Sequence, residues 1–256
     1  MDDPELLERE HRSQAAYYRL LANGHADSFV ADLPGGVQAT VVPVSPSRSL
    51  PNAVLYDDPA AVIAGHAELS DVYARAGVRA WTVWVRPGDD DLAYALEQRG
   101  HRLDGTPMIM GTALEGLGLE AQATLDLDEQ PRWDVAGAIN DAAYGLEPGA
   151  LRGPLSALRS DQISLIIARL DGEPVACAGF LTTGGDCQAG FVATLPQARG
   201  RGLCAAIMRE GLRRARADGA TSTTLEGSAK GEPVYQRLGY RDLGRARMME
   251  LRARTS

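Results

Sequence analysis

The sequence from Phe191 to Met208, FVATLPQARGRGLCAAIM, joins an apolar run to two closely spaced glycines and then to a helical pattern. Gly200 and Gly202 remove two Cβ atoms where the first backbone N–H groups of a helix have no intrahelical acceptor. A helix start of this kind attracts anions. The stretch therefore predicts a strand, a tight anion-binding loop and a helix.

Charge is distributed unevenly along the chain. Residues 1–122 carry 9 Arg against 18 Asp or Glu, a net charge of −9, whereas the remainder carries 17 Lys or Arg against 16 acids, a net charge of +1. We expect a polyanionic cofactor in the second half. The predicted helix after the glycines has a cationic face that carries Arg209, Arg213 and Arg216. The acidic first half disfavours nucleic acid and could attract a cationic substrate.

Two motifs in the second half resemble those of one enzyme family. The segment QARGRG, Gln197–Gly202, matches the Q/R-x-x-G-x-G/A pattern of the GNAT family of N-acetyltransferases, and VYQRLGY, Val234–Tyr240, is similar to its aromatic and Leu-Gly-aromatic element. The resemblance extends over roughly residues 124–251. It implies an α/β (α+β) fold, a mixed and mostly antiparallel sheet flanked by helices, and acetyl-CoA as cosubstrate.

The resemblance also implies where acetyl-CoA binds. In the family, the strand before the glycine loop separates from its neighbour and holds the pantetheine arm, and the loop amides hold the pyrophosphate. The corresponding residues here are Val192, Ala193, Thr194, Arg199, Gly200, Arg201, Gly202, Leu203 and Cys204. This sequence departs from the family at two positions on that side: Ser228 stands where many members carry an asparagine that contacts the cofactor, and Gly231 replaces a common alanine.

Catalytic groups are harder to assign. Tyr235 lies where several family members place a general acid that protonates the leaving thiolate, although a packed aromatic residue explains the position too. The strand before the loop, residues 188–195, has no carboxylate, so Glu226 is the nearest candidate for the general base. Alternatively, Glu226 is an ion-paired strand residue, and the amine loses its proton through ordered water. Cys187 and Cys204 are weak candidates for an acyl-enzyme nucleophile because every histidine lies at residue 101 or earlier.

The length of 256 residues suits two domains. We predict a degenerate GNAT-like or accessory domain at 1–120 and an acetyl-CoA-binding GNAT domain at 121–256. A weak internal sequence similarity supports tandem domains: residues 93–101 can be aligned with 233–240, and Met108–Met110 with Met248–Met249. Periodicity further predicts one helix from Pro59 to Arg75 and one final strand from Tyr240 to Leu251.

The sequence thus predicts an N-acetyltransferase in which a primary amine attacks acetyl-CoA directly in a ternary complex. The amine could be a small molecule or a peptide, and another acyl group could replace acetyl. A noncatalytic acyl-CoA sensor or scaffold is the alternative. We expect no metal, since three cysteines show no C-x-x-C spacing, and no nucleic acid or membrane partner; the protein is expected to be cytoplasmic, as a monomer with pseudo-dimeric domains or a homodimer.

Overall fold

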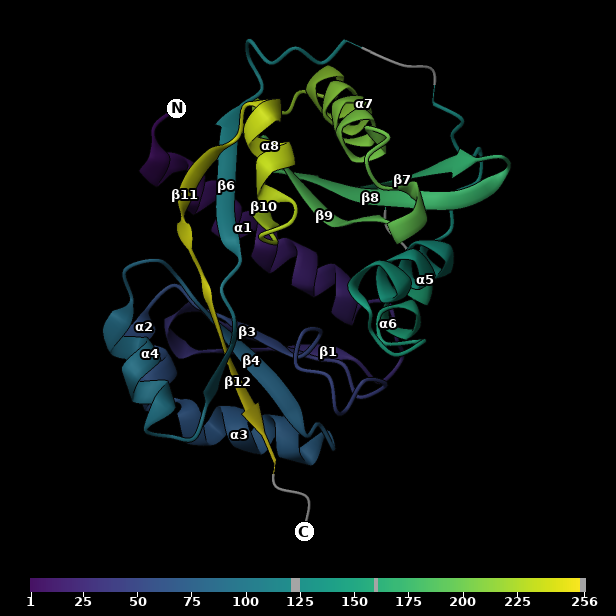
Figure 1. Ribbon diagram of the computed structural model, residues 1–256. Helices are drawn as coiled ribbons and strands as arrows, with labels where there is room; N and C mark the ends of the chain where they lie inside the picture. Colours follow the sequence, from purple (N-terminus) through teal and green to yellow (C-terminus); the bar gives the residue numbers. More distant parts are fainter. Residues whose placement is uncertain (121–124, 159–160, 254–256) are drawn as a thin grey trace. The chain divides into compact units, whose positions relative to one another are not determined.

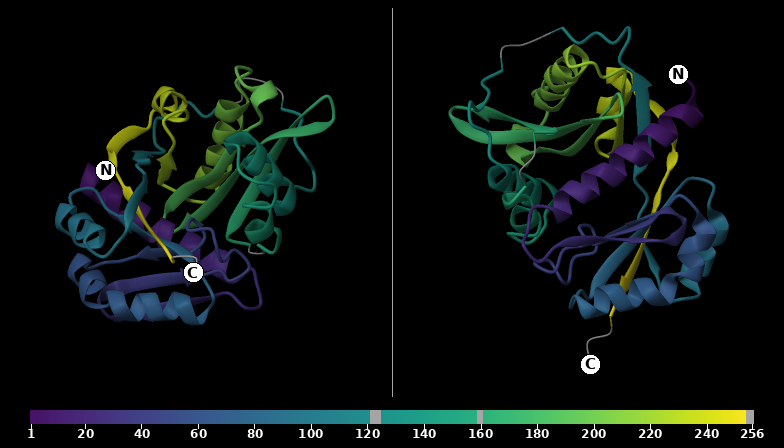
Figure 2. Two further views of the ribbon diagram at one scale, coloured as in Figure 1. Left: turned by 60° about the horizontal axis from the view of Figure 1, so that its bottom comes forward. Right: turned by 180° about the vertical axis from the view of Figure 1, so that it is seen from behind.

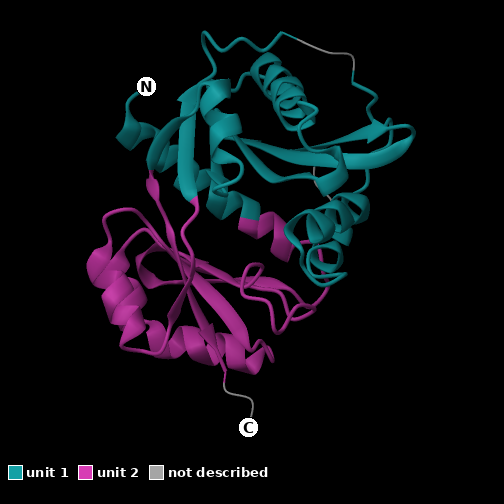
Figure 3. Cartoon of the chain, viewed as in Figure 1, with its two compact units in different colours: residues 1–17, 108–243 teal, residues 18–107, 244–256 magenta. Residues whose placement is uncertain are grey.

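The computed structural model describes residues 1–120, 125–158 and 161–253. The chain forms two compact units, shown in Figure 3. Unit 1 comprises residues 1–17 and 108–243, and unit 2 comprises residues 18–107 and 244–256. Each unit contains one six-stranded sheet, mixed and mostly antiparallel, with helices packed on it. The predicted α/β class and sheet type are confirmed.

The sheet of unit 1 has the strand order β11-β6-β10-β9-β8-β7. One face carries α7 and α8, and the other carries α5, α6 and the first part of α1 (Figure 1, Figure 2). The elements are α1 (Asp3–Ala22), β6 (Met108–Ala113), α5 (Trp133–Tyr144), α6 (Arg152–Ser156), β7 (Ile163–Leu170), β8 (Glu173–Thr183), β9 (Asp186–Thr194), α7 (Leu203–Ala217), β10 (Ser222–Gly227), α8 (Glu232–Leu238) and β11 (Arg241–Arg245).

Two neighbouring strands of this sheet run parallel and then separate. The pairing of β9 with β10 covers only residues 186–188 and 222–224. Beyond it, β9 continues to Thr194 and leads through a short 3₁₀ turn, Pro196–Ala198, to the glycine loop. The separation opens the sheet at the amino end of α7, where the sequence predicts the cofactor.

The sheet of unit 2 has the strand order β1-β2-β3-β4-β12-β5. Its core joins apolar strand residues such as Val83 to helix residues such as Leu69 and Leu96. The elements are β1 (Phe29–Leu33), β2 (Val37–Val41), β3 (Ala53–Leu55), α2 (Pro59–Ala64), α3 (His66–Arg75), β4 (Ala80–Val85), α4 (Asp90–Glu97), β5 (Arg102–Gly105) and β12 (Arg247–Arg252).

The two sheets repeat one topology and exchange one strand each. In unit 2, β12 lies between β4 and β5; in unit 1, β6 lies between β10 and β11. Thus β6 follows β5 along the chain but pairs with β10, with Met110 opposite Leu225. In turn β12 follows β11 but pairs with β4, with Met249 opposite Val83. The internal sequence similarity therefore corresponds to a repeat in the fold.

The strand exchange corrects one prediction and bears on another. The predicted single strand from Tyr240 to Leu251 is two strands in two different sheets, separated at Ala246. The predicted division at residues 120 and 121 remains a prediction, and residues 121–124 lie outside the described residues. The compact units are not consecutive in sequence, because each takes a strand from the other half of the chain.

Smaller differences between the predicted and the observed helices and strands have local causes. The predicted helix Pro59–Arg75 is two helices, α2 and α3, which meet at Gly65. Strands β1 and β5 escape prediction because both are short edge strands with mostly exposed or half-buried side chains and no clear apolar alternation. In the parts of the chain that the structure describes, no helix combines the length and the apolar character needed to cross a lipid bilayer.

Candidate active site

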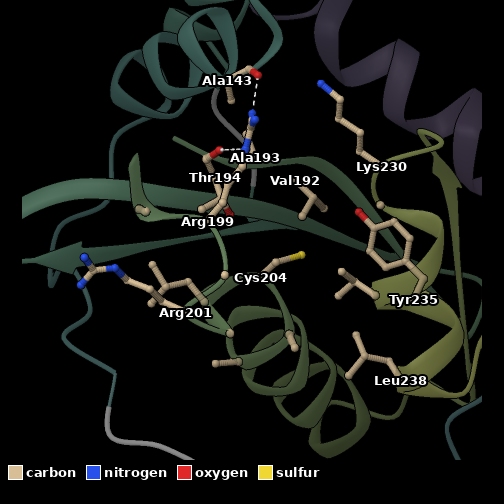
Figure 4. Close-up of a pocket in the computed structure, with 18 of the residues that line it drawn as sticks. Ala143, Val192, Ala193, Thr194, Arg199, Arg201, Cys204, Lys230, Tyr235 and Leu238 are labelled. Carbon is tan, nitrogen blue, oxygen red and sulfur yellow. Dashed lines mark hydrogen bonds between the residues drawn. The ribbon is translucent and has the colours of Figure 1, made fainter. Parts of the chain in front are cut away.

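A cleft of about 1400 Å³ opens in unit 1 where β9 and β10 separate. Its walls come from the end of α5, the end of β9, the glycine loop, the first turns of α7, the loop after β10, and α8 (Figure 4). All ten residues predicted to bind the cofactor line it: Val192, Ala193, Thr194, Arg199, Gly200, Arg201, Gly202, Leu203, Cys204 and Ser228. Tyr235 lines it as well, whereas Glu226 does not.

The glycine loop has the backbone geometry that its sequence predicts. Gly200 has φ +77° and Gly202 has φ +75°, a left-handed conformation that side chains disfavour. Gly202 is the N-cap of α7 and provides no side-chain cap, so the first N–H groups of the helix stay open toward the cleft. Together with the dipole of this 15-residue helix, they form a site for an anion.

Side-chain charge around the cleft is positive. Among the described residues that line it, none is Asp or Glu, and five are basic: Arg199, Arg201, Arg209, Lys230 and Arg237. The Nε of Arg209 is buried without a hydrogen-bond partner. A buried donor left unsatisfied is costly, so Arg209 is well placed to meet a phosphate. Arg213, on the same helix, instead forms a bidentate pair with Glu210 at 2.9 Å.

The side chain of Arg199 hydrogen-bonds the glycine loop to two neighbouring elements. Its Nη2 donates to the carbonyl of Ala143 at 2.7 Å, and its Nε donates to the carbonyl of Thr194 at 3.2 Å (Figure 4). These bonds tie the end of α5 and the end of β9 to the glycine loop. The guanidinium of Arg199 is therefore engaged with protein carbonyls, and its backbone is the part best placed to meet a pyrophosphate.

A bulge interrupts β9 next to the cleft. Gly190 lies opposite Gly179 and Ala193 opposite Cys177, so Phe191 and Val192 together face Ala178. Phe191 has φ +51°, an unusual value for a residue with a side chain, and its carbonyl accepts from Asn140 Nδ2 at 3.1 Å. A bulge leaves backbone groups unpaired and often lies beside an active site. The bulge thus takes Phe191 and Val192 out of the regular ladder between β8 and β9 beside the cleft.

Tyr144 closes part of the cleft. Its side chain lines the cofactor cleft. Its hydroxyl donates to the carbonyl of Val192 at 2.9 Å, and it also hydrogen-bonds to Ser228. Tyr144 therefore connects the two separated strands across the opening. No sequence motif marks this contact, because it joins residues that are 48 positions apart.

Tyr235 is a buried phenol at the inner end of the cleft. The side chain is 6% exposed, and its hydroxyl points into the cleft from α8 (Figure 4). Burial raises its pKa well above the ordinary value of tyrosine, and the thiol of Cys204 and the phenol of Tyr144 add to the effect. The group is therefore protonated at neutral pH and can act as a proton donor.

Glu226 and Gln188 lie on the α1-facing side of the sheet. Along β10, Leu225 packs in the core against α7, whereas Thr224 and Glu226 point the opposite way. Gln188 Nε2 donates to the Glu226 carboxylate at 2.7 Å. Cys187 is buried away from the cleft, and burial raises the pKa of its thiol to about 12. The structure thus brings Tyr235 to the cofactor residues and separates Glu226 and Cys187 from the cleft.

Comparison with known proteins agrees with this geometry. Residues 130–240 match the family model for the acetyltransferase (GNAT) family. The match to the GNAT family covers less than half of the chain. The matched segment contains the glycine loop and Tyr235, together with every other residue assigned to the cofactor. No curated protein matches the sequence of the chain.

Solved structures share the fold of the whole chain at low sequence identity. A GCN5-related N-acetyltransferase from Kribbella flavida has a TM-score of 0.68 at 19% identity, covering 94% of this chain and 95% of its own. One from Sphaerobacter thermophilus has a TM-score of 0.60 at 18% identity, with 89% and 81% covered. A tandem GNAT protein from the clavulanic acid pathway has a TM-score of 0.59 at 12% identity, with 97% and 96% covered. These likenesses concern the fold alone.

Unit 2 has a different loop where unit 1 carries its glycines. In the repeated topology, the β3–α2 connection corresponds to the glycine loop. Its residues are Tyr56, Asp57 and Asp58, and Pro59 begins α2. Asp58 accepts a hydrogen bond from the N–H of Ala60 at 2.9 Å, so its carboxylate occupies the helix start, and proline offers no N–H. The start of α2 is therefore capped by a carboxylate, whereas the start of α7 has no side-chain cap.

Proposed function

We propose that the protein is an acetyl-CoA-dependent N-acetyltransferase that transfers the acetyl group directly to a primary amine. The observation that carries the proposal is the cleft itself. Open helix N–H groups at Gly202 and Leu203 lie at one end, a buried proton donor at Tyr235 lies at the other, and the described residues that line the cleft include five cations. A long polyanion that ends in a thioester fits this order of groups.

Each group of residues along the cleft would have its own role. The amides of the glycine loop and Arg209 would hold the pyrophosphate, and the backbone of Val192 to Thr194 would hold the pantetheine arm. Backbone N–H groups at the bulge would stabilise the negative charge that develops on the thioester oxygen. Tyr235 would give its proton to the departing sulfur.

The remaining assignments extend the proposal. The domain at residues 121–256 would carry acetyl-CoA, and the degenerate repeat in the first 120 residues would support the fold or the acceptor site. A small-molecule or peptide amine is the proposed acceptor. The repeat supplies the second GNAT-like half within one chain, so a monomer with pseudo-dimeric domains is the proposed assembly.

A noncatalytic acyl-CoA sensor is a second candidate, and one observation favours it. The described residues that line the cleft include no carboxylate and no histidine to accept a proton from an amine. A protein that only binds acyl-CoA needs no such base. The two candidates differ in turnover rather than in binding.

Release of free CoA thiol from acetyl-CoA, measured over a panel of primary amines, tests the proposal. An acetyltransferase releases thiol in proportion to amine and forms the matching amide, which mass spectrometry detects. A sensor binds acetyl-CoA and releases thiol only at the hydrolytic background. Binding without amine-dependent release across small amines, amino acids and peptides would replace the enzyme by the sensor.

A further inference from the structure

The bulge in β9 orients one peptide group toward α5. The peptide joins Phe191 to Val192, and its carbonyl accepts a hydrogen bond from Nδ2 of Asn140 on α5 at 3.1 Å. In a planar trans peptide the carbonyl and the following N–H point to opposite sides. The N–H of Val192 therefore points away from α5, whereas α7 and the cleft lie on the other face of the sheet.

Asn140 is buried behind this peptide rather than in the cleft. Its side chain is 1% exposed, and it is not among the described residues that line the cleft. Its Nδ2 also donates to the carbonyl of Ala136 at 2.9 Å. Both partners are carbonyl oxygens, which can only accept, so the amide nitrogen has to face them and uses both of its N–H groups. Asn140 thus holds the Phe191 carbonyl from the side away from the cleft.

Cys177 on β8 is a second donor to the same carbonyl. Its Sγ lies 3.4 Å from the carbonyl oxygen of Phe191 and 3.3 Å from Nδ2 of Asn140. Burial raises the pKa of this thiol to about 12, so the sulfur keeps its proton and can donate it. A thiol is a weak donor, so Asn140 supplies the stronger of the two bonds.

Phe191 has a conformation that its surroundings must support. Its φ of +51° is a left-handed value that is uncommon for a residue with a large side chain. Its ring packs edge-on against the rings of Tyr17 and Trp133, with centroid distances of 5.4 Å and 6.2 Å. Such a conformation persists only where the structure around it fixes it. The two rings hold the side chain of Phe191, whereas Asn140 holds its peptide group.

Asn140 and Tyr144 hold successive carbonyls of the bulge from one side of α5. They are four residues apart along the helix, so their side chains lie on the same face. Asn140 donates to the carbonyl of Phe191, and Tyr144 donates to the carbonyl of Val192 at 2.9 Å. Tyr144 lines the cleft, where a ligand can displace its hydroxyl, and Asn140 does not. The bond from Asn140 can therefore persist when the cleft is filled.

We propose that Asn140 is a positioning residue for acetyl transfer: by anchoring the Phe191 carbonyl, it keeps the N–H of Val192 directed at the thioester oxygen in the cleft. This inference rests on the proposed acetyltransferase function. Asn140 acts through the backbone and touches neither acetyl-CoA nor the amine. Its value lies in preorganisation, because a donor that is already in place when negative charge develops stabilises the transition state without a cost of reorientation.

Loss of the amide at residue 140 would remove the main restraint on this peptide. With an apolar side chain there, the Phe191 carbonyl would keep only the weak thiol donor of Cys177. An unsatisfied buried carbonyl is costly, so the peptide would tend to rotate. Rotation would turn an oxygen toward the cleft in place of the N–H of Val192. Acetyl-CoA binding, which depends mainly on the glycine loop and Arg209, would change little, whereas the chemical step would slow.

Pair-labelled protein tests the direction of the N–H in the wild type. With ¹³C at the phenylalanine carbonyl and ¹⁵N in valine, a carbonyl-filtered NMR spectrum shows only valine amides that follow a phenylalanine. The sequence contains two such pairs, Phe29–Val30 in unit 2 and Phe191–Val192 in unit 1. Acetyl-CoA should move the Val192 amide proton downfield relative to CoA, which has no thioester oxygen, and should leave Val30 in place. Equal Val192 positions with the two ligands would contradict the inference.

Two substitutions test the side chain itself. Asn140→Leu keeps much of the volume and removes the donor, and Asn140→Asp keeps the shape but offers an acceptor when it is ionised. Each should lower kcat by about 10- to 100-fold and change the KM for acetyl-CoA by no more than a few-fold. The shift of Val192 between CoA and acetyl-CoA should shrink in both. Ile139→Val, which removes one methylene from the core cluster behind β9, is the control and should keep kcat and the shift.

The outcomes separate this inference from the proposed function. Calorimetry with acetyl-CoA shows first that each variant folds and binds. If the wild type transfers acetyl but Asn140→Leu keeps its kcat and its Val192 shift, Asn140 is structural and the inference fails. If neither variant folds, the wild-type comparison of acetyl-CoA with CoA decides alone. If the wild type binds acetyl-CoA but transfers acetyl to no amine, the proposed function itself fails, whatever the spectrum shows.

Discussion

A Cβ atom at Gly231 would lie 2.8 Å from Cε2 of Tyr235, closer than real side chains approach. The ring of Tyr235, the proposed general acid, therefore packs against the backbone of Gly231. Gly231→Ala should displace the phenol and lower kcat by about 10-fold or more, because proton transfer depends on position. Rapid-mixing or steady-state thiol release measures the change.

A double mutant makes this prediction specific. In a Tyr235→Phe background, Gly231→Ala should add little, because the hydroxyl that it displaces is already absent. Gly153→Ala on α6 is the matched control, since a Cβ there meets no atom within 4 Å. Additive losses from Gly231→Ala and Tyr235→Phe would show that Gly231 acts on something other than this phenol.

Tyr144 is expected to compete with the cofactor. Its hydroxyl donates to the Val192 carbonyl at 2.9 Å, a backbone group proposed to hold pantetheine. Tyr144→Phe frees that carbonyl and should strengthen acetyl-CoA binding by about 2- to 10-fold, the equivalent of one ordinary hydrogen bond. Calorimetry gives the Kd directly. Tyr94→Phe, at an exposed tyrosine of unit 2, is the control, and weaker binding in Tyr144→Phe alone would mean that the phenol assists the cofactor.

Cys204 lines the cleft but should not carry the acyl group. Burial raises the pKa of its thiol to about 11, so only about one molecule in 10,000 is a thiolate at pH 7. Cys204→Ala should therefore retain transfer within a few-fold. Rapid-quench mass spectrometry of the wild type with acetyl-CoA should find no acetyl group on the chain, and an acetyl thioester on Cys204 would instead establish an acyl-enzyme route.

Unit 2 should lose stability in mild acid. His66 and His101 approach each other at 3.0 Å between their Nε2 atoms, and Nδ1 of His101 bonds to the carbonyl of Met249 at 2.9 Å. Burial lowers the pKa of His101 to about 4 and lowers that of His66 too. Since the folded state resists protonation, the contribution of His101 is complete above pH 6.5 and is lost as the pH falls toward 4, by up to ~3 kcal/mol.

Fluorescence follows this transition, because the ring of Trp81 lies 4.8 Å from that of His101. Urea unfolding of the wild type between pH 7 and pH 4 should show a steeper loss of stability than His101→Gln, which cannot take up the proton. His25→Gln serves as the control, since that histidine is only half-buried in the connection between α1 and β1. Equal slopes in the wild type and His101→Gln would contradict the assignment.

Local sequence patterns predicted the backbone geometry of the glycine loop and the position of Tyr235 on the following helix. Gly200 and Gly202 have positive φ because they shape a helix start, and Tyr235 follows from its place one turn before Gly239. Such features depend on a few neighbouring residues, so a sequence displays them directly. The same reasoning could have placed Glu226 on the far face, since alternation with the core residue Leu225 decides it.

Long-range pairing could not be predicted in this way. The strands β6 and β12 have similar methionine-containing sequences, and nothing local indicates which sheet each one joins. The contacts of α1 with the sheet are hidden for the same reason, because a helix sequence shows an apolar or polar face but not the strand that it covers.

Calorimetric titration of acetyl-CoA into wild type, Gly202→Val and Gly219→Val tests the central claim most directly. Both glycines have positive φ, +75° and +95°, and a Cβ at either meets no atom within 4 Å, so both substitutions strain the backbone alike at opposite ends of α7. The account predicts one binding site in the wild type, a loss of at least 10-fold in affinity for Gly202→Val, and wild-type affinity for Gly219→Val. An absence of binding to the wild type, or equal affinity in the two variants, would contradict it.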